Sequence, residues 1–223
     1  METNQVHVRE GACSQGLGLL NLDQGTLLVK TARNAISSYF SQQPPAQITY
    51  QPGLPDRRGI FVSLFHASNG HVLRGCVGDP FGMDDLINTL QKVAVEAAVN
   101  DYRFDPVTPL EFENVIVVDV NVLSEMESIW VKNPEDYVMN VEIGKHGLMV
   151  DGNGFRGLLL PQVAVEEGFD AEEFLCHCCM KAGLPLDSWL TGNVQISKFQ
   201  TQIFEEETPK GHVVERHVDS STK

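Results

Sequence analysis

The stretch 59-GIFVSLFHASNGHVLRGCVG-78 contains two runs of β-favouring residues separated by the pair Asn69-Gly70. An Asn-Gly pair is typical of a two-residue type I′ turn, which joins two neighbouring antiparallel strands. The turn fixes the register, so Ser63 is expected opposite Cys76. The stretch therefore predicts an antiparallel hairpin and, with it, a fold built on antiparallel pairing.

Side chains of this hairpin alternate between two faces. In the same register Arg74 lies opposite Phe65, so Arg74 and Cys76 share one face. Gly75 and Gly78 flank the thiol and are expected where the backbone turns tightly. The other face is apolar and is expected to pack on the core; it carries Ile60, Val62, Leu64, Leu73 and Val77. A guanidinium and a thiol are thus predicted as neighbours on the less uniform face.

The rest of the chain mixes helix and strand patterns without the regular alternation of a doubly wound parallel sheet. The fold class predicted is α+β, a mainly antiparallel sheet flanked by helices. Helices are expected from Thr26, read as an N-cap, to before Pro44; from just after Gly82 to near Asn100; and from Asp170 to Gly183. Strands are expected within 114–124, 147–161 and 193–207, with a second hairpin turn at 151–154.

Composition limits the class of protein. The chain has 223 residues, 42% of them hydrophobic, and a formal net charge of -14 from 16 basic and 30 acidic residues. Such an acidic surface repels a phosphate backbone, so generic nucleic-acid binding is disfavoured. No apolar run reaches the length of a membrane span, and the first residues lack an apolar signal core. We therefore expect a cytoplasmic protein, nuclear in a eukaryote as an alternative, that does not bind membranes.

Three of the five cysteines lie in the run CHCC at 176–179. In a reducing compartment free thiols are expected. On a helix Cys176 and Cys179 share a face while Cys178 points elsewhere, and no second paired-cysteine motif follows, so no metal site is predicted. The glycine-rich segment 75–82 matches neither a P-loop nor a dinucleotide fingerprint, and no cofactor is predicted.

Six stretches, in their order and spacing, resemble the AMMECR domain family from about Leu27 to Glu206. They are RGIFVSL, LRGCVG, DYRF with Pro106 and Pro109 after it, GKHGL, GLLLPQVAVEEGF, and KAGLP followed by FQTQIF. The chain departs from the usual family pattern at Val77, Tyr102 and Phe169, and none of these changes removes an ionisable group.

The resemblance implies two closely packed lobes with a cleft between them. Residues 25–207 are then one domain, with a larger lobe of about 25–125 plus 190–207 and a smaller lobe of about 126–189. Residues 1–24 are expected to form an N-terminal extension, and 208–223 a disordered tail because they lack an apolar pattern. Some family members are fused to Memo-like and radical-SAM modules, which implies such proteins as candidate partners; the resemblance assigns no reaction.

Cys76 is the candidate catalytic thiol, as a nucleophile or an acid–base group. Arg74 on the same strand face and the helix start after Gly82 are expected to lower its pKa. The alternative is a small buried cysteine at a strand end. His146 in GKHGL is the candidate base that assists Cys76, and its alternative is a structural histidine.

Arg74, Arg103 and Arg156 are candidate substrate-binding cations able to hold a carboxylate or phosphate. Their alternative is a surface salt bridge or a guanidinium bonded to buried carbonyls. Two functions stay open: a small-substrate or modified-nucleoside enzyme, related to RNA modification, that uses Arg74 and Cys76 in the cleft; or a non-catalytic protein-interaction module. The enzyme predicts a concave site with converging Arg, Cys and His side chains, and the module predicts a flat or apolar patch with inert thiols.

Overall fold

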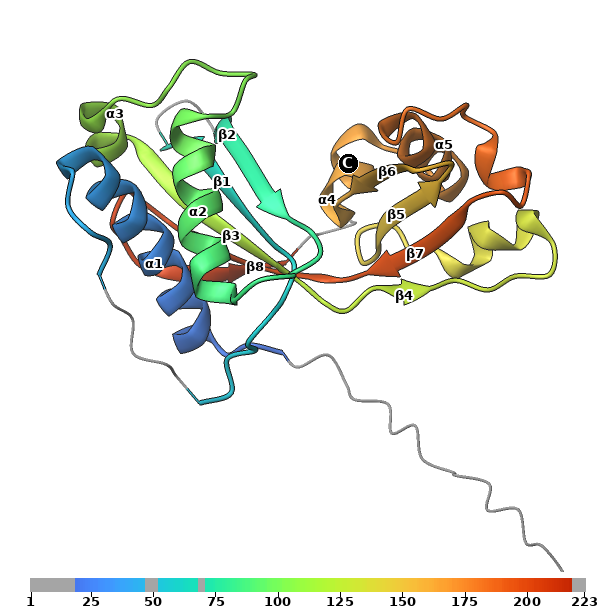
Figure 1. The fold of residues 1–223 in the computed structure, drawn as a ribbon, viewed down its shortest axis with the longest axis horizontal. Coiled ribbons are helices and arrows are strands. Elements are labelled where there is room, and N and C mark those ends of the chain that lie inside the picture. Colours follow the sequence, from blue (N-terminus) through green and yellow to red (C-terminus); the bar gives the residue numbers. More distant parts are fainter. Residues whose placement is uncertain (1–18, 47–51, 68–70, 218–223) are drawn as a thin grey trace, which may run out of the picture.

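The computed structural model describes residues 19–46, 52–67 and 71–217 and contains helices with two antiparallel sheets, so the α+β prediction is confirmed (Figure 1). The larger sheet has the strand order β2-β1-β3-β8-β9 and the smaller sheet the order β4-β7-β5-β6. Strand bounds are β1 Ile60–His66, β2 Val72–Asp79, β3 Ile116–Leu123, β4 Glu127–Ser128, β5 Gly147–Gly152, β6 Phe155–Leu159, β7 Gln195–Phe199, β8 Thr201–Glu206 and β9 Val213–Arg216.

The helices are α1 Leu22–Ser41, α2 Leu86–Val99, α3 Pro109–Asn114, α4 Pro161–Glu167 and α5 Ala171–Lys181, with short 3-10 helices η2 Pro134–Asn140 and η3 Ser188–Leu190. Across residues 19–46, 52–67 and 71–217, no helix has both the length and the apolar character that a membrane crossing needs. We call the larger sheet with α1, α2 and α3 the larger lobe, and the smaller sheet with α4 and α5 the smaller lobe.

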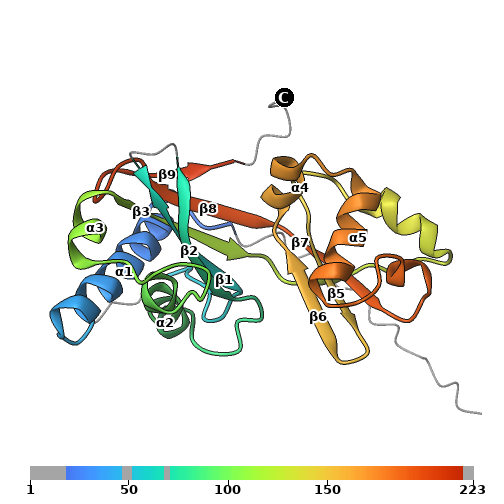
Figure 2. The ribbon, with the colours of Figure 1, turned by 90° about the horizontal axis from the view of Figure 1, so that it is seen from above.

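Each lobe has its own hydrophobic core. In the larger lobe, α1 and α2 cover one face of the sheet (Figure 2), where Val62, Leu64, Val118 and Val120 are fully buried. The core of the smaller lobe forms between its sheet and α5, around residues such as Phe174. The helical face of the larger sheet is therefore an apolar core, whereas the opposite face carries buried polar side chains such as Ser63, Asp119 and Asn121.

The hairpin of β1 and β2 is antiparallel, and Ser63 lies opposite Cys76, as predicted. The pairs nearest the turn are shifted by one residue, so Phe65 pairs with Leu73 and not with Arg74. A β-bulge takes up the extra residue and restores the predicted register at Cys76. The Asn69-Gly70 turn itself lies outside the described residues.

The glycines beside Cys76 serve close packing, which corrects the expectation of a tight turn there. A Cβ at Gly75 would lie 2.1 Å from the carbonyl oxygen of Ala97 in α2, and one at Gly78 would lie 2.3 Å from the ring of Phe61. The left-handed backbone conformation occurs later, at Gly82, with φ of +56°. Strand β2 can therefore approach α2 because it lacks a side chain at Gly75, and the missing side chain at Gly78 leaves room for the ring of Phe61 in β1.

The first helix begins earlier than the predicted N-cap at Thr26. Asn21 caps it and forms a capping box with Gln24, and Gly25 lies inside the helix, where a Cβ would overlap the ring of Phe204. Residues 22–24 are therefore part of α1 and not of the expected N-terminal extension, and Gly25 is a contact of α1 with β8.

The expected last strand at 193–207 is divided between the two sheets. It forms β7 in the smaller sheet and β8 in the larger sheet, and the chain passes from one to the other at Gln200. Ser124, which leads from β3 to β4, donates its N–H to the carbonyl of Gln200 at 2.8 Å. Residues 190–199 therefore belong to the smaller lobe, contrary to the expected boundary at 190.

Part of the expected disordered tail is a strand. β9 pairs antiparallel with β8, with Arg216 opposite Ile203 and Val213 opposite Glu206. Val213 packs in the core of the larger lobe, so one apolar contact together with ladder hydrogen bonds orders a segment that has no apolar pattern. Residues 218–223 lie outside the described part of the chain.

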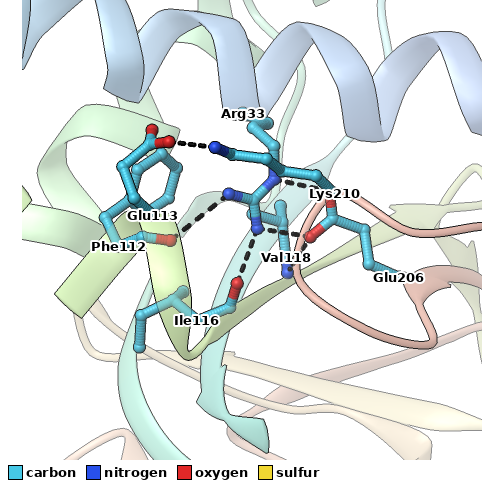
Figure 3. Close-up of polar contacts among 7 residues, drawn as sticks. All are labelled: Arg33, Phe112, Glu113, Ile116, Val118, Glu206 and Lys210. Carbon is cyan, nitrogen blue, oxygen red and sulfur yellow. Dashed lines mark hydrogen bonds and ion pairs between the residues drawn. The ribbon is translucent and has the colours of Figure 1, made fainter. Parts of the chain in front are cut away.

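A buried ion pair fixes α1 on the larger sheet (Figure 3). Arg33 donates from Nε and Nη2 to the two carboxylate oxygens of Glu206, and from Nη1 and Nη2 to the carbonyl oxygens of Phe112 and Ile116. Glu206 also accepts the N–H of Val118 at 3.0 Å. Three elements that are far apart in sequence are thus joined through one guanidinium and one carboxylate.

Candidate functional site

The face of the larger sheet that α1 and α2 leave uncovered carries a band of polar side chains. Cross-strand pairing sets four of them in one row across β2, β1, β3 and β8: Cys76, Ser63, Asp119 and Glu205. The next row runs through Asn121 and Ile203 to Arg216 in β9. We call six of these residues the polar face: Cys76, Ser63, Asp119, Asn121, Glu205 and Arg216. Ile203 lies in the second row but is not included.

Hydrogen bonds link the members of the polar face. Ser63 Oγ lies 3.3 Å from Cys76 Sγ. Asp119 accepts at Oδ1 from the amide of Asn121 and at Oδ2 from Arg216 Nη2, at 3.2 Å. Arg216 Nε lies 3.1 Å from a carboxylate oxygen of Glu205, although it is not oriented to donate a hydrogen bond to it. The polar face thus consists of two adjacent groups: the pair Ser63 and Cys76, and the network of Asp119, Asn121, Arg216 and Glu205.

Helix α4 of the smaller lobe closes one side of this network. Gln162, in its first turn, donates from Nε2 to Asn121 Oδ1 at 3.3 Å. Its Oε1 is buried, and no hydrogen-bond donor among the described residues reaches it. An unpaired buried acceptor beside a polar cluster is the arrangement that a ligand N–H would satisfy.

Asp119 has an unusual proton affinity. Its side chain is 1% exposed, and burial raises its pKa to about 7, although the charge and hydrogen bond of Arg216 hold the pKa down. A carboxyl group with a pKa near neutrality can both release and accept a proton at physiological pH. Asp119 is therefore the residue of the polar face best suited to acid–base chemistry.

Cys76 differs from the expectation of an activated thiolate. It is half-buried, and burial raises the pKa of its thiol above the ordinary value, with Asp119 and Asp101 adding to the rise. The hydrogen bond from Ser63 and the charge of Arg103 oppose this rise without reversing it. Cys76 is therefore a neutral thiol at neutral pH, and the expected lowering of its pKa is wrong.

Arg74 is not the cation that acts on this thiol. It donates from Nε and Nη2 to both carboxylate oxygens of Glu111 in α3, at 2.7 and 3.2 Å, and from Nη1 to the carbonyl of Asp105. The bulge at Arg74 and these bonds direct its guanidinium toward α3. Arg74 thus matches the alternative interpretation of a guanidinium held by a carboxylate and carbonyls.

Arg103 takes the position next to Cys76. Its Nη2 donates to the carbonyl of Cys76 at 3.1 Å, and it forms two side-chain bonds with Asp101, at 3.0 and 2.7 Å. Asp101 also accepts the backbone N–H of Cys76, and the bond from Arg103 is the main cause that lowers the pKa of Asp101 to about 2. The stretch DYRF therefore anchors the strand that carries the thiol.

Arg156 is half-exposed on β6 and is not part of the polar face. It pairs with Asp151 across the second hairpin, and its guanidinium lies 5.2 Å from the ring centroid of Phe81, which follows β2. The contact crosses from the smaller to the larger lobe. Arg156 thus serves as a link between lobes in this structure.

His146 and Cys76, predicted to act together, lie in different parts of the molecule. It lines a cavity of about 440 Å³ at the junction of the two sheets, and none of Cys76, Arg74, Arg103 and Arg156 lines that cavity. Its Nδ1 accepts the N–H of Glu142 at 3.0 Å, and burial lowers its pKa, so the ring is neutral. The structure thus brings Cys76 and Arg103 together, and leaves Arg74, Arg156 and His146 at three separate places.

Sequence reasoning missed the carboxyl groups and Arg216. The alternation in 114–124 already turns Asp119 and Asn121 away from the core side of the strand, which was the available signal. Arg216 gave no signal, because its strand lies in the segment expected to be disordered. Within residues 19–46, 52–67 and 71–217, no group of three or more His, Cys, Asp or Glu side chains is arranged to hold a metal ion.

Similarity to known proteins extends over most of the chain. The model of the AMMECR1 family matches residues 29–204. Protein MJ0810 of Methanocaldococcus jannaschii is 44% identical over 198 residues, covering 89% of this chain and 98% of the relative. Protein MK0488 of Methanopyrus kandleri is 43% identical, covering 88% and 95%. The names of these relatives state no reaction.

A solved structure has the same fold. The crystal structure of uncharacterized protein PH0010 from Pyrococcus horikoshii superposes with a TM-score of 0.82 at 38% sequence identity, and the match covers 89% of this chain and 98% of that one. The family match and the sequence identities agree over nearly the same residues. The chain belongs to the AMMECR1 family.

Proposed function

We propose that the protein is an enzyme that transfers a proton to or from a small substrate bound against the polar face, with Asp119 as the general acid–base group. The observation that carries this proposal is the buried carboxyl of Asp119, whose pKa is raised to about 7. A carboxyl tuned to neutrality inside a hydrogen-bonded polar cluster is typical of an acid–base catalyst.

The neighbours of Asp119 have separate roles in this proposal. Arg216 stabilises the carboxylate form after the proton has left, because its Nη2 donates to Oδ2. Asn121 orients the carboxyl through the other oxygen. Cys76 stays protonated and acts as a thiol that contacts the substrate, since its raised pKa disfavours attack as a thiolate.

The unpaired acceptor of Gln162 suggests the class of substrate. Its buried Oε1 is satisfied by a substrate that presents an N–H group. Nucleobases and other cyclic amides have N–H groups, which can lose a proton, next to carbonyl oxygens, which can accept one. A modified nucleoside is thus a substrate class that fits the donors and acceptors around Asp119.

Titration of the Asp119 carboxyl is the first test. Its side-chain ¹³C shift, assigned by comparison with the Asp119→Asn variant, is expected to titrate with a midpoint near 7. A midpoint near the ordinary value of about 3.9 removes the basis of the proposal. The same spectra, recorded with single nucleosides added, report whether a ligand shifts the titration.

Turnover is the second test. The protein is incubated with a panel of modified nucleosides in D₂O, and mass spectrometry follows deuterium uptake or product formation. Loss of a general acid–base group typically lowers a rate by about 10²- to 10⁴-fold, so Asp119→Asn should lose the reaction while Arg156→Gln keeps it. A reaction that survives in Asp119→Asn would contradict the assignment. A normal Asp119 titration together with no reaction on the panel would favour the interaction module.

A further inference from the structure

The cavity at the junction of the two sheets lies apart from the polar face. It is formed where the chain passes between the sheets, beside the Ser124 and Gln200 pair, and its volume is about 440 Å³. Pockets of roughly 300–1,000 Å³ are of the size that holds small ligands. Neither Asp119 nor Cys76 lines it.

Two cations in this cavity form only long ion pairs with the residues that the structure describes. The side chain of Arg58 is only 19% exposed, yet among these residues its single ion pair is a 3.6 Å contact with Glu125, whose side chain is 88% exposed. Lys198 is 20% exposed, and its single ion pair within the same part of the chain is a 3.9 Å contact with Glu127, which is 73% exposed. Neither cation donates a hydrogen bond to any group in residues 19–46, 52–67 and 71–217. Mostly buried cations normally have charge-assisted hydrogen bonds, so these two are available to an anion.

His146 adds a third donor to the same cavity. Its Nδ1 accepts the N–H of Glu142, so the neutral ring carries its proton on Nε2. No acceptor within the described part of the chain receives a hydrogen bond from this Nε2–H. Lys198 lies close enough that its charge helps to lower the pKa of His146.

Part of the remaining wall of the cavity is apolar, and polar residues such as Ser124 and Thr201 complete it. Leu20, Met126 and Phe199 line it, and Leu20 is itself held by two hydrogen bonds with Gln202. A free inorganic anion would use the cations and leave this apolar wall in contact with water. An organic anion uses both parts, because its charged group meets the cations while its carbon chain covers the wall.

We infer that the cavity binds a small organic oxyanion, a carboxylate or phosphate attached to an apolar body, held by Arg58, Lys198 and His146. This binding site goes beyond the proposed acid–base chemistry of Asp119 and does not depend on it. The exposed carboxylates Glu125 and Glu127 are displaced to solvent when the anion takes their place beside the cations.

Two probes separate the head groups, and a third tests the charge. Hexanoate, hexyl phosphate and uncharged hexanol are titrated into the full chain, and the ring signals of His146 are followed by NMR. We expect saturable shifts with hexanoate, with hexyl phosphate or with both, and the tighter probe identifies the head group. Hexanol is expected to leave the His146 signals unchanged.

Arg58→Gln and Lys198→Gln test the two cations, and Arg156→Gln is the matched control, since Arg156 does not line the cavity. Loss of a charge-assisted hydrogen bond should weaken binding by about 10- to 100-fold in each of the first two variants and leave the control unchanged. Failure of both anionic probes to bind at up to about 10 mM would overturn the inference, as would equal binding by hexanol or undiminished binding by both cation variants. None of these readouts depends on the reaction proposed for Asp119.

Discussion

Arg216 Nη2 lies 3.2 Å from Asp119 Oδ2 and joins the edge strand β9 to the central strand β3 of the larger sheet. The two residues are not directly opposite each other, because β8 separates their strands and the guanidinium reaches diagonally across it. This contact opposes the effect of burial on the Asp119 carboxyl.

Removing Arg216 should raise the pKa of Asp119 further. Burial disfavours the carboxylate, and Arg216 is the group that offsets this effect by charge and by hydrogen bonding. In Arg216→Gln the ¹³C titration midpoint of Asp119 is expected to move above 7, whereas Arg156→Gln should leave it in place. An unchanged midpoint in Arg216→Gln would mean that the ion pair is not formed in solution.

Asp119 should also make the stability of the fold depend on pH. The folded carboxyl, with a pKa of about 7, keeps a proton that the unfolded chain releases near pH 4. Its contribution to the free energy of unfolding is therefore complete below about pH 4 and is lost as the pH rises through 7. Urea unfolding from pH 4 to 8 should show a weaker decline with pH for Asp119→Asn than for the wild type. Parallel curves would contradict the raised pKa.

Alkylation should report a protonated Cys76. The rate with iodoacetamide is expected to rise with a midpoint above the ordinary thiol pKa, because burial raises the pKa of Cys76. Arg103→Gln should move the midpoint higher still, since Arg103 is the cation that opposes this rise. Arg74→Gln is the matched control and should have no effect, because its guanidinium is held by Glu111.

The other cysteines calibrate that experiment. Cys178 and Cys179 are buried, and the pKa of Cys178 is raised to about 12, so both should be labelled more slowly than Cys76 in the folded protein. Peptide mapping by mass spectrometry separates the sites. A Cys76 midpoint well below 9 would restore the activated thiolate and overturn this account.

The two ion pairs in Figure 3 should differ strongly in their effect on stability. Arg33→Met leaves the buried carboxylate of Glu206 without its partner and should lower the free energy of unfolding by about 3–5 kcal/mol. Lys210→Met removes the pair with Glu113, in which both side chains are partly exposed, and should cost no more than about 1 kcal/mol. Chemical denaturation measures both. The double variant Arg33→Met with Glu206→Gln should be more stable than Arg33→Met alone, and a still less stable double variant would contradict the unpaired-charge explanation.

Local sequence patterns were enough to predict much of the fold. The alternation in the first hairpin and the pairing of Ser63 with Cys76 follow from period and turn chemistry alone. In the second hairpin Asn153 and Gly154 both have positive φ, as a type I′ turn requires. Such features depend on residues that are close in sequence, which is why the sequence predicts them.

The candidate site depends on sheet order, which local patterns do not contain. Asp119 meets Arg216 only because β8 and β9 add to the far edge of the sheet that the hairpin begins. The β-bulge at Arg74 also affects which arginine lies beside Cys76. Arg74 contacts Glu111 in α3, and Arg103 contacts the backbone of Cys76 instead. A bulge of one residue could not be predicted from the alternation of polar and apolar residues, because that alternation is compatible with the strand register on either side of the bulge.

The pairing of Ser124 with Gln200 has an architectural consequence. The chain leaves the larger sheet and returns to it at two adjacent points, so the intervening segment is an insertion into an otherwise self-contained fold. A short turn that replaces residues 125–199 would join β3 to β8 as an ordinary hairpin. The shortened protein would retain Cys76, Asp119 and Arg216 but would lack Gln162, so the insertion is the part that provides an outer wall for the polar face.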